Sequence, residues 1–202
     1  MDRNWGQQNM NIAKDLLQAV NFAADKHRDQ RRKNVESSPY INHPIQVAEL
    51  IARVGDIDDL TVLMAAVLHD TVEDTKTTFD EIENAFGSEV RDLVAEVTDD
   101  KSLLKAERKK RQVEHTAQIS DRAKLIKIAD KTCNVRDVTD SPPEDWNIQR
   151  RTDYLNWASR VVDGCRGASP HLERYFDETL ARGTEALGSV ASQIGSMHES
   201  EY

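Results

Sequence analysis

Apolar residues recur at steps of three and four along several stretches of the chain, which is the spacing of one helical face. The clearest case covers about residues 12–29. Its repeated apolar positions are Leu16, Leu17, Val20, Ala23 and Ala24. A second helix is expected around Pro44, because proline suits the first turn of a helix. That helix should reach about Val54 and stop at Gly55.

The segment Leu60–Leu68 is almost entirely apolar, so its period does not separate a buried helix from a buried strand. Its Met64, Ala65 and Ala66 favour a helix, and no partner strand is evident elsewhere in the sequence. We therefore expect a buried helix here.

Polar residues mark where further helices begin. Thr78 and Glu81 have the spacing of a capping box. Ser88 and Ser120 stand where N-cap residues are expected, each just before an apolar periodic stretch. The highly charged segment 101–115 is expected to be a solvated helix or a mobile loop.

Two more helices are expected after the Ser141-Pro-Pro break, one over about residues 144–162 and one from Ser169-Pro170 to near Gly183. Residues 184–202 are rich in Gly, Ser, Ala and Glu, a composition typical of disorder. The sequence therefore predicts an all-α bundle of about eight to ten helices over residues 1–183. A polar, disordered tail over residues 184–202 would follow it.

Composition narrows the class of protein. The 202 residues carry a formal net charge of −9, which argues against general nucleic-acid binding. No apolar run approaches the ~20 residues of a membrane span, and the polar residues 1–11 contain no signal-peptide stretch. The two cysteines, Cys133 and Cys165, form no C-x-x-C pair and fit a reducing compartment. We expect a cytoplasmic protein with no membrane and no nucleic-acid partner.

The apolar segment that ends at Leu68 leads directly into His69-Asp70 and then into Glu73 and Asp74. A buried helix should not end in unpaired charges, because desolvating a carboxylate is costly unless something pairs it. A metal ion is the simplest partner. On a helix, Glu73 and Asp74 lie one turn beyond His69 and Asp70, so all four could face one pocket. Groups crowded in this way have pKa values that are pushed apart, as acid–base chemistry requires.

Asp130 repeats this pattern in a second strongly apolar stretch, and Asn134 follows it at i+4 on the same face. His43 stands where the chain enters a helix. A lone His or Asp is more often structural, but the adjacent His69-Asp70 pair makes metal ligation the better interpretation. Histidines and aspartates from three segments form a mixed N/O set that suits Mn²⁺, Fe²⁺ or Zn²⁺ better than Ca²⁺.

Other polar residues have plainer interpretations. His27, His115, His171 and His198 lie in polar contexts and are expected at the surface. Cys133 is expected to be a small core residue. No nucleophile elbow or phosphate-binding loop occurs, so a hydrolase would need a metal-activated water.

The order His43, His69-Asp70, Asp130 matches the H…HD…D signature of the HD metal-dependent phosphohydrolase superfamily. More specific segments are Arg-Arg-Lys at 31–33, Tyr-Ile-Asn-His-Pro at 40–44, Leu-His-Asp-Thr-Val-Glu-Asp at 68–74, Val-Thr-Asp-Asp-Lys at 97–101, and Ile-Ala-Asp-Lys at 128–131 with Asn134. Over about residues 12–182 the chain resembles the hydrolase domain of RelA/SpoT homologues. The likeness is strongest to the single-domain small alarmone hydrolases, which include the metazoan SpoT homologue.

The resemblance implies an all-α fold and a reaction that uses Mn²⁺. The reaction removes the 3′-pyrophosphate of guanosine tetra- or pentaphosphate (ppGpp, pppGpp), giving GDP or GTP and pyrophosphate. The implied metal ligands are His43, His69, Asp70 and Asp130. Glu73 and Asp74 would orient and activate water and assist the leaving group, while Asn134 would line the site.

The resemblance also implies the contacts to a nucleotide substrate. Arg32 and Lys33 would lie against the base, and Lys105 and Arg150 would reach phosphates. Tyr154 matches a residue at the nucleotide pocket. An acidic protein needs such local cations to hold a polyanion.

One departure from the family leaves the substrate open. Thr132-Cys133 stands where the family commonly has Leu followed by His or Tyr. A phosphohydrolase that prefers ppApp or pppApp, or that removes the 2′-phosphate of NADPH, is therefore the alternative. A non-catalytic nucleotide sensor is least favoured, because every ligand and acid position is filled. Since only a short tail follows the hydrolase segment, we expect no synthetase activity.

Overall fold

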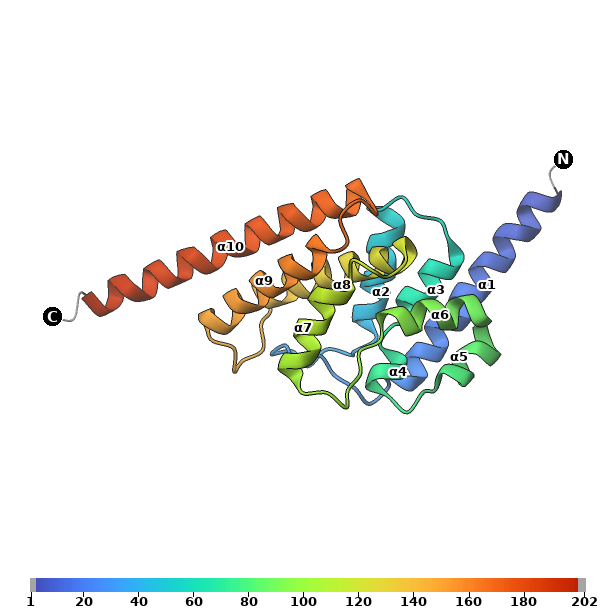
Figure 1. The fold of residues 1–202 in the computed structure, drawn as a ribbon, viewed down its shortest axis with the longest axis horizontal. Coiled ribbons are helices and arrows are strands. Elements are labelled where there is room, and N and C mark those ends of the chain that lie inside the picture. Colours follow the sequence, from blue (N-terminus) through green and yellow to red (C-terminus); the bar gives the residue numbers. More distant parts are fainter. Residues whose placement is uncertain (1–2, 200–202) are drawn as a thin grey trace.

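The computed structural model describes residues 3–199, with side chains over residues 12–191 (Figure 1). The helices are α1 (Arg3–Lys26), α2 (Asn42–Arg53), α3 (Leu60–Leu68), α4 (Thr71–Asp74), α5 (Phe79–Phe86), α6 (Ser88–Val97), α7 (Lys105–His115), α8 (Asp121–Asp140), α9 (Ile148–Asp163) and α10 (Pro170–Glu199). Two isolated β-bridges are the only extended pairings over this range, so the predicted all-α fold is confirmed. Over the same residues, no helix combines the length and apolar character needed to cross a bilayer.

Helix α8 is the centre of the bundle, where it packs against α2, α3, α6, α9 and α10. Helix α10 runs along α8 and α9, and α1 projects from the opposite end of the molecule (Figure 1). Every residue of α8 from Leu125 to Cys133 is buried. Because this stretch includes Lys127, Asp130 and Lys131, the bundle contains charged groups that need specific partners.

The apolar segment forms α3 as predicted, and all its residues from Val62 to Leu68 are buried. Each large apolar side chain of this kind contributes roughly 1.5–3 kcal/mol when fully buried. Helix α3 ends at Leu68, and His69 and Asp70 form its junction with the single-turn helix α4. Asp70 has φ −95° and ψ −5°, outside regular helical values, so Glu73 and Asp74 belong to a separate turn.

Most predicted helix starts are confirmed. Thr78 and Glu81 form a reciprocal capping box, and the Ser120 side chain accepts a hydrogen bond from a backbone N–H in the first turn of α8. The expectation that Ser88 caps α6 is wrong. Gly87 holds the N-cap position with φ 89°, a conformation that glycine adopts readily, so Ser88 is already inside the helix.

The C-terminal helices differ from the prediction at their ends. Helix α9 begins at Ile148 rather than near residue 144, because the Asn147 side chain caps it. Helix α10 does not end near Gly183 but runs on to Glu199. A Cβ atom at Gly183 would lie 2.6 Å from Thr139 Oγ1, so this glycine allows α10 to pack closely on α8. The division at residue 183 into a domain and a disordered tail stays a prediction, although its boundary falls inside α10.

Candidate active site

The four predicted ligands come together from three segments: His43 on α2, His69 and Asp70 at the α3–α4 junction, and Asp130 on α8. His43 Nε2 lies 3.1 Å from Asp130 Oδ1 and 3.8 Å from Asp70 Oδ2. His69 Nε2 lies 3.1 Å from Asp70 Oδ2 and 4.0 Å from Asp130 Oδ1. Ligand atoms of His43, His69 and Asp130 are all within 4.8 Å of one another, and all three residues are buried.

The donor atoms fit a divalent metal ion. His69 Nδ1 lies 2.7 Å from the carbonyl oxygen of Ala66, which can only accept, so Nδ1 carries the hydrogen and Nε2 directs a lone pair into the site. This Nε2 is buried and has no hydrogen-bond partner. Two imidazoles and two carboxylates form the N/O set that divalent transition metals accept.

The electrostatics of the site also attract a cation. Burial by itself lowers the pKa of His69, but the Asp70 and Asp130 carboxylates outweigh burial and raise it to about 9. Burial would raise the pKa of Asp130, but the Lys131 ammonium and His43 hold it well below its usual range. The carboxylates therefore favour a positive charge at this position, which a proton on His69 or a bound metal ion can supply.

Two residues that the sequence analysis gave no role hold these carboxylates in place. Tyr40 donates its hydroxyl hydrogen to Asp70 Oδ2 at 2.6 Å. Lys131 Nζ donates to Asp130 Oδ2 at 2.8 Å, and Asn134 Nδ2 donates to Asp130 Oδ1 at 2.5 Å. Tyr40 and Lys131 both lie inside the segments that carry the family resemblance, which was the available signal.

The two predicted acids lie on α4 in different surroundings. Glu73 Oε2 accepts a hydrogen bond from the backbone N–H of Asp99 at 3.1 Å. Burial raises the pKa of Glu73 to about 7, and the Asp70 and Asp99 carboxylates add to this effect. Asp74 instead accepts hydrogen bonds from Gln30 Nε2 at 2.9 Å and from Lys101 Nζ. Glu73 therefore has a pKa near neutral pH, whereas Asp74 is paired with the Lys101 ammonium.

The surroundings of Asp74 include His27, which the sequence analysis placed at the surface. His27 is not a surface residue, because only 2% of it is exposed. Its Nδ1 lies 2.7 Å from Oε1 of Gln30, the residue whose amide nitrogen bonds Asp74. The polar sequence around His27 gave no sign that it is buried and contacts Asp74 through Gln30. His115 and His171 are exposed as expected, and the side chain of His198 lies outside the described residues.

Two neighbouring cavities share Trp146 and Tyr154 in their walls. The larger, of about 380 Å³, contains the predicted Arg32, Lys33, Asp74 and Asn134. The smaller, of about 230 Å³, contains the predicted Glu73 and Lys105, together with Lys109 and Trp157. The two acids therefore face two parts of one composite site, separated by aromatic rings.

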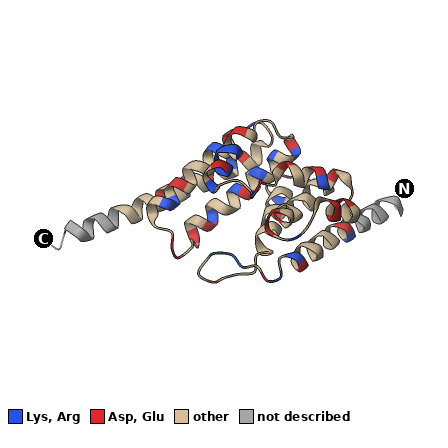
Figure 2. Ribbon diagram, turned by 60° about the horizontal axis from the view of Figure 1, so that its bottom comes forward, with Lys and Arg blue, Asp and Glu red and all other residues tan. Residues whose placement is uncertain are grey.

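The predicted cations are distributed unevenly over this site. Arg32 is not free, because its Nη2 donates to Asp137 Oδ2 at 2.5 Å and to Asn134 Oδ1 at 3.1 Å. Burial lowers the pKa of Lys105, and the nearby positive charges of Arg150 and Lys33 lower it further. Asp and Glu are spread along the bundle, while several Lys and Arg gather near its middle (Figure 2). Lys33 and Arg150 lie near enough to Lys105 to lower its pKa, so the three form a local positive region, in which Arg150 also pairs with Asp145 at 3.1 Å.

Sequence reasoning missed an aromatic and cationic group in the smaller cavity. Lys109 Nζ lies 4.5 Å from the centre of the Trp157 ring and 5.3 Å from that of Tyr154. The Trp157 indole N–H donates to the Lys109 carbonyl oxygen at 3.0 Å. In the sequence, Lys109 belongs to a charged run with no feature that separates it from its neighbours.

Comparisons with known proteins bear on this site. A family model described as an HD domain matches residues 19–158. A guanosine-3′,5′-bis(diphosphate) 3′-pyrophosphohydrolase MESH1 from Danio rerio is 53% identical over 171 residues, which cover 84% of this chain and 95% of the relative. The protein of the same name from Homo sapiens is 54% identical over 161 residues, covering 80% of this chain and 90% of the relative.

A solved structure shows the same likeness in three dimensions. It is of a metazoan ortholog of SpoT, described as hydrolysing ppGpp and playing a role in starvation responses. It superposes with a TM-score of 0.81 at 48% identity, and the match covers 83% of this chain and 94% of that one.

Proposed function

This chain belongs to the HD domain family, and on that premise we propose that it hydrolyses the 3′-pyrophosphate of ppGpp and pppGpp, releasing pyrophosphate and GDP or GTP. The observation that carries the proposal is the buried group of His43, His69 and Asp130 behind a two-part cavity, whose lining residue Asn134 donates a hydrogen bond to Asp130. That cavity combines two acids with cations and aromatic rings, which suits a polyanionic nucleotide. Relatives with this activity in their names support it.

We assign the metal to His43, His69, Asp70 and Asp130, and we propose Mn²⁺ as the ion. When bound, such an ion supplies Lewis-acid chemistry, polarising a phosphoryl oxygen and lowering the pKa of water. The carboxylates and neutral imidazoles of this set suit Mn²⁺. Tyr40 and Lys131 would keep Asp70 and Asp130 oriented, because each holds one carboxylate oxygen.

The acids would divide the proton transfers between them. With its pKa near 7, Glu73 can take a proton from an attacking water and give it up again. Asp74, paired with Lys101, would position that water or the leaving group. Asn134 would fix the sugar side of the site, since it already bonds Asp130.

The two cavities suggest how a nucleotide lies. In this proposal, the base occupies the larger cavity against Arg32 and Lys33. The phosphates extend toward Lys105 and Arg150, and Tyr154 lies between the two parts. A guanidinium and aromatic rings can stack on a base, whereas the ammonium groups act as point charges for phosphates.

The alternative substrates, ppApp or NADPH, rested on the Thr132-Cys133 departure. Both residues are buried, and neither lines either cavity. Thr132 Oγ1 donates to the carbonyl of Ile128 within α8, which uses its polar group internally. The departure therefore lies behind the pocket wall, and we keep guanosine alarmones as the first choice.

A turnover panel tests the proposal. Purified protein with Mn²⁺ would be offered ppGpp, ppApp and NADPH at equal concentrations, with products separated by anion-exchange chromatography. We expect the highest kcat/KM for ppGpp, with pyrophosphate as a product, and turnover by Asp130→Ala that is lower by on the order of 10³-fold. If ppApp or NADPH were turned over faster, that nucleotide would replace ppGpp as the proposed substrate. If none of the three were turned over, the proposed hydrolase activity would be wrong.

The location and further partners are also proposals. Cys133 and Cys165 are free and buried, which is compatible with a reducing cytoplasm. The net charge of −9 gives no general attraction to nucleic acid. We therefore propose a cytoplasmic enzyme whose partner is its nucleotide substrate.

A further inference from the structure

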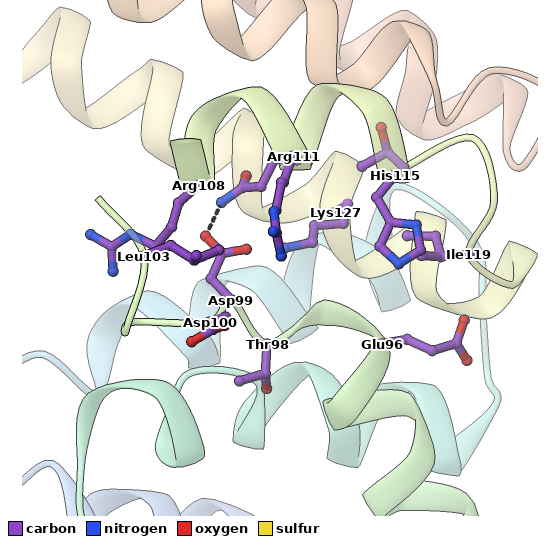
Figure 3. Close-up of a pocket in the computed structure, with 12 residues that line it drawn as sticks. Glu96, Thr98, Asp99, Asp100, Leu103, Arg108, Arg111, His115, Ile119 and Lys127 are labelled. Carbon is purple, nitrogen blue, oxygen red and sulfur yellow. Dashed lines mark hydrogen bonds between the residues drawn. The ribbon is translucent and has the colours of Figure 1, made fainter. Parts of the chain in front are cut away.

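A third cavity, of about 170 Å³, adjoins the smaller active-site cavity along α7 (Figure 3). We refer to it as the rear cavity. Its walls come mainly from α7, from Glu96 near the end of α6 and the residues Thr98 to Asp100 after it, and from Lys127 on α8. The rear cavity shares Asp99, Arg108 and Gln112 with the smaller active-site cavity, so these residues form the partition between the two.

Lys127 is a buried cation without a counter-ion. Only 8% of the residue is exposed, and its Nζ donates a single hydrogen bond, to the carbonyl oxygen of Val97 at 2.7 Å. No carboxylate of the described residues lies within 4.0 Å of Nζ. Burial lowers the pKa of Lys127 and the Lys131 ammonium lowers it further, while the carboxylates of Asp99, Asp130 and Glu73 oppose this only in part. An unpaired buried ammonium is costly, so an anion in the cavity would stabilise it.

Other cationic side chains line the rear cavity and have few partners. Arg111, His115 and Lys127 face the space between α7 and the segment beneath it (Figure 3). Within the described part of the chain, the side chains of Arg108 and His115 make no hydrogen bond or ion pair. Arg111 has one, to Glu107 on its own helix at 3.5 Å. Such an exposed pair contributes little, so the guanidinium is available to a ligand.

The cavity wall has three acidic residues, Glu96, Asp99 and Asp100, and each accepts a hydrogen bond from a neighbouring group. Glu96 accepts hydrogen bonds from the backbone N–H of Ser120 at 2.6 Å and from its hydroxyl at 3.0 Å. Asp100 accepts from the backbone N–H of Ser102 at 2.9 Å and from its hydroxyl at 2.6 Å. These bonds use both oxygens of Glu96 but only Oδ1 of Asp100, whose charge lies near Arg111 and Arg108 without forming an ion pair with either.

The side chain of Gln112 requires that a ligand in the rear cavity donate one hydrogen bond. Its Nε2 donates to Asp99 Oδ2, and this bond is drawn in Figure 3. Its Oε1 is buried and has no hydrogen-bond partner. A buried acceptor without a donor is unfavourable by about 1–3 kcal/mol. A ligand that pairs with the cationic side chains and also donates a hydrogen bond to Gln112 Oε1 must therefore be an anion that carries an O–H or N–H group.

We propose that the rear cavity binds one hydrogen phosphate ion, held by Lys127, Arg111 and His115, with its O–H donated to Gln112 Oε1. The cavity is several times the roughly 30 Å³ that one water occupies in the liquid, which is room for a tetrahedral oxyanion. Sulfate carries the same charge as hydrogen phosphate but has no hydrogen at neutral pH. The Gln112 acceptor therefore distinguishes the two ions. This inference does not depend on the proposed hydrolase activity.

Calorimetric titration of the full chain with inorganic phosphate tests the proposal, with the metal in place and again after chelation. We expect one phosphate per chain in both states. Melting temperature, compared with sodium chloride at equal ionic strength, should rise with phosphate, because a ligand that binds only the folded state stabilises it. Sulfate should bind at least about fivefold more weakly, since it leaves Gln112 Oε1 unsatisfied.

Matched variants locate the ion. Lys127→Met and Arg111→Gln should each weaken phosphate binding about tenfold or more, because each removes a charge-assisted contact. Arg111 is on the exposed helix α7, so its variant tests the site even where Lys127→Met alters folding. Lys110→Gln, whose side chain is 65% exposed outside the cavity, should bind as the wild type does.

Active-site binding of phosphate is the rival explanation, and Lys105→Gln separates it. In the rear cavity, phosphate affinity is independent of Lys105 and of metal. Loss of binding in Lys105→Gln or after chelation, with normal binding in Arg111→Gln, would overturn the proposal. So would the absence of binding at 10 mM phosphate, about the weakest affinity of a built site. Equal affinity for sulfate would overturn the Gln112 contact.

Discussion

Helices α7 and α8 both line the candidate active site, but they hold their charged residues in opposite surroundings. In α8, every residue from Leu125 to Cys133 is buried, and Asp130 and Lys131 are paired inside the bundle. Helix α7 has no buried residue, yet it supplies Lys105 and Lys109 to the smaller cavity. A charge in a buried helix must have a specific partner. In an exposed helix, a functional cation and an ordinary one have the same surroundings.

The largest expected effect is that of a substitution in the buried helix α8. Asp130→Ala should abolish metal binding and reduce turnover by on the order of 10³-fold, because the metal stabilises several kcal/mol of transition-state charge. The helical bundle should stay folded but lose about 3–5 kcal/mol of stability, because the change leaves Lys131 buried without its carboxylate partner. Metal content by mass spectrometry, kcat and circular dichroism measure the three outcomes.

Chelation of the wild type provides the control for that variant. It should remove activity to a similar extent, and Mn²⁺ should restore it best among divalent ions. Full turnover by chelated, metal-free protein would contradict the assignment of His43, His69, Asp70 and Asp130 as ligands.

The acids of α4 should give a smaller effect of a different kind. Glu73→Gln and Asp74→Asn should retain metal but lose turnover by about 10²-fold, the usual contribution of general acid–base catalysis. Metal content and kcat are measured on the same preparation. If either variant lost metal as completely as His69→Ala, that acid would have to be reassigned as a ligand.

Glu73 also predicts a pH dependence of stability. Burial raises its pKa from about 4.5 to about 7, so between these values the folded state holds a proton that the unfolded state releases. This group therefore stabilises the fold less as the pH rises, by up to about 3 kcal/mol between pH 4.5 and 7. Glu73→Gln lacks the titrating group. As the pH rises over this range, the free energy of unfolding of the wild type should therefore fall relative to that of the variant. Urea unfolding of both metal-free proteins at pH 5 and pH 8 measures the difference, and an equal difference at both would refute it.

Local sequence signals predicted the parts of the site that depend on burial. The apolar run that ends in His69-Asp70 and the aspartate within the apolar stretch of α8 are both visible as anomalies in a hydrophobic pattern. Capping signals at Thr78 and Ser120 act within one turn of helix, and the structure confirms both. Interactions of this range need no knowledge of the fold.

Contacts between distant segments could not be predicted in the same way. Tyr40 bonds Asp70 across 30 positions, and the buried His27 reaches Asp74 only through Gln30. Gly183 marks close packing of α10 on α8 rather than a helix end. In each case the deciding partner is fixed by how helices pack, and the residue itself has an ordinary local context.

The exposed helix should give a weaker and more selective effect. Lys105→Ala should raise KM about tenfold and change kcat less, because a phosphate contact kept in both ground and transition states mainly affects binding. Rising salt should reduce the difference between variant and wild type by screening. Steady-state kinetics at low and high ionic strength measure both effects.

Lys14→Ala is the control, because this exposed lysine lies on α1 and has no assigned role. It should behave as the wild type does. Equal KM values for the Lys105 and Lys14 variants at low salt would assign Lys105 to a solvated face.

The smallest effect concerns the start of α7, which lacks the side-chain cap that Ser120 gives to α8. Leu104 is the N-cap residue of α7, with φ −60° and ψ 147°, and it is 82% exposed. Leu104→Ser keeps an allowed backbone conformation and completes the Ser-x-x-Glu spacing with Glu107 at N3. A capping hydroxyl contributes about 1 kcal/mol, so the amides of α7 should exchange about fivefold more slowly while those of α8 are unchanged. Leu104→Ala removes the same exposed side chain without adding a cap, and equal exchange rates in the two variants would show that the N-terminus of α7 gains nothing from capping.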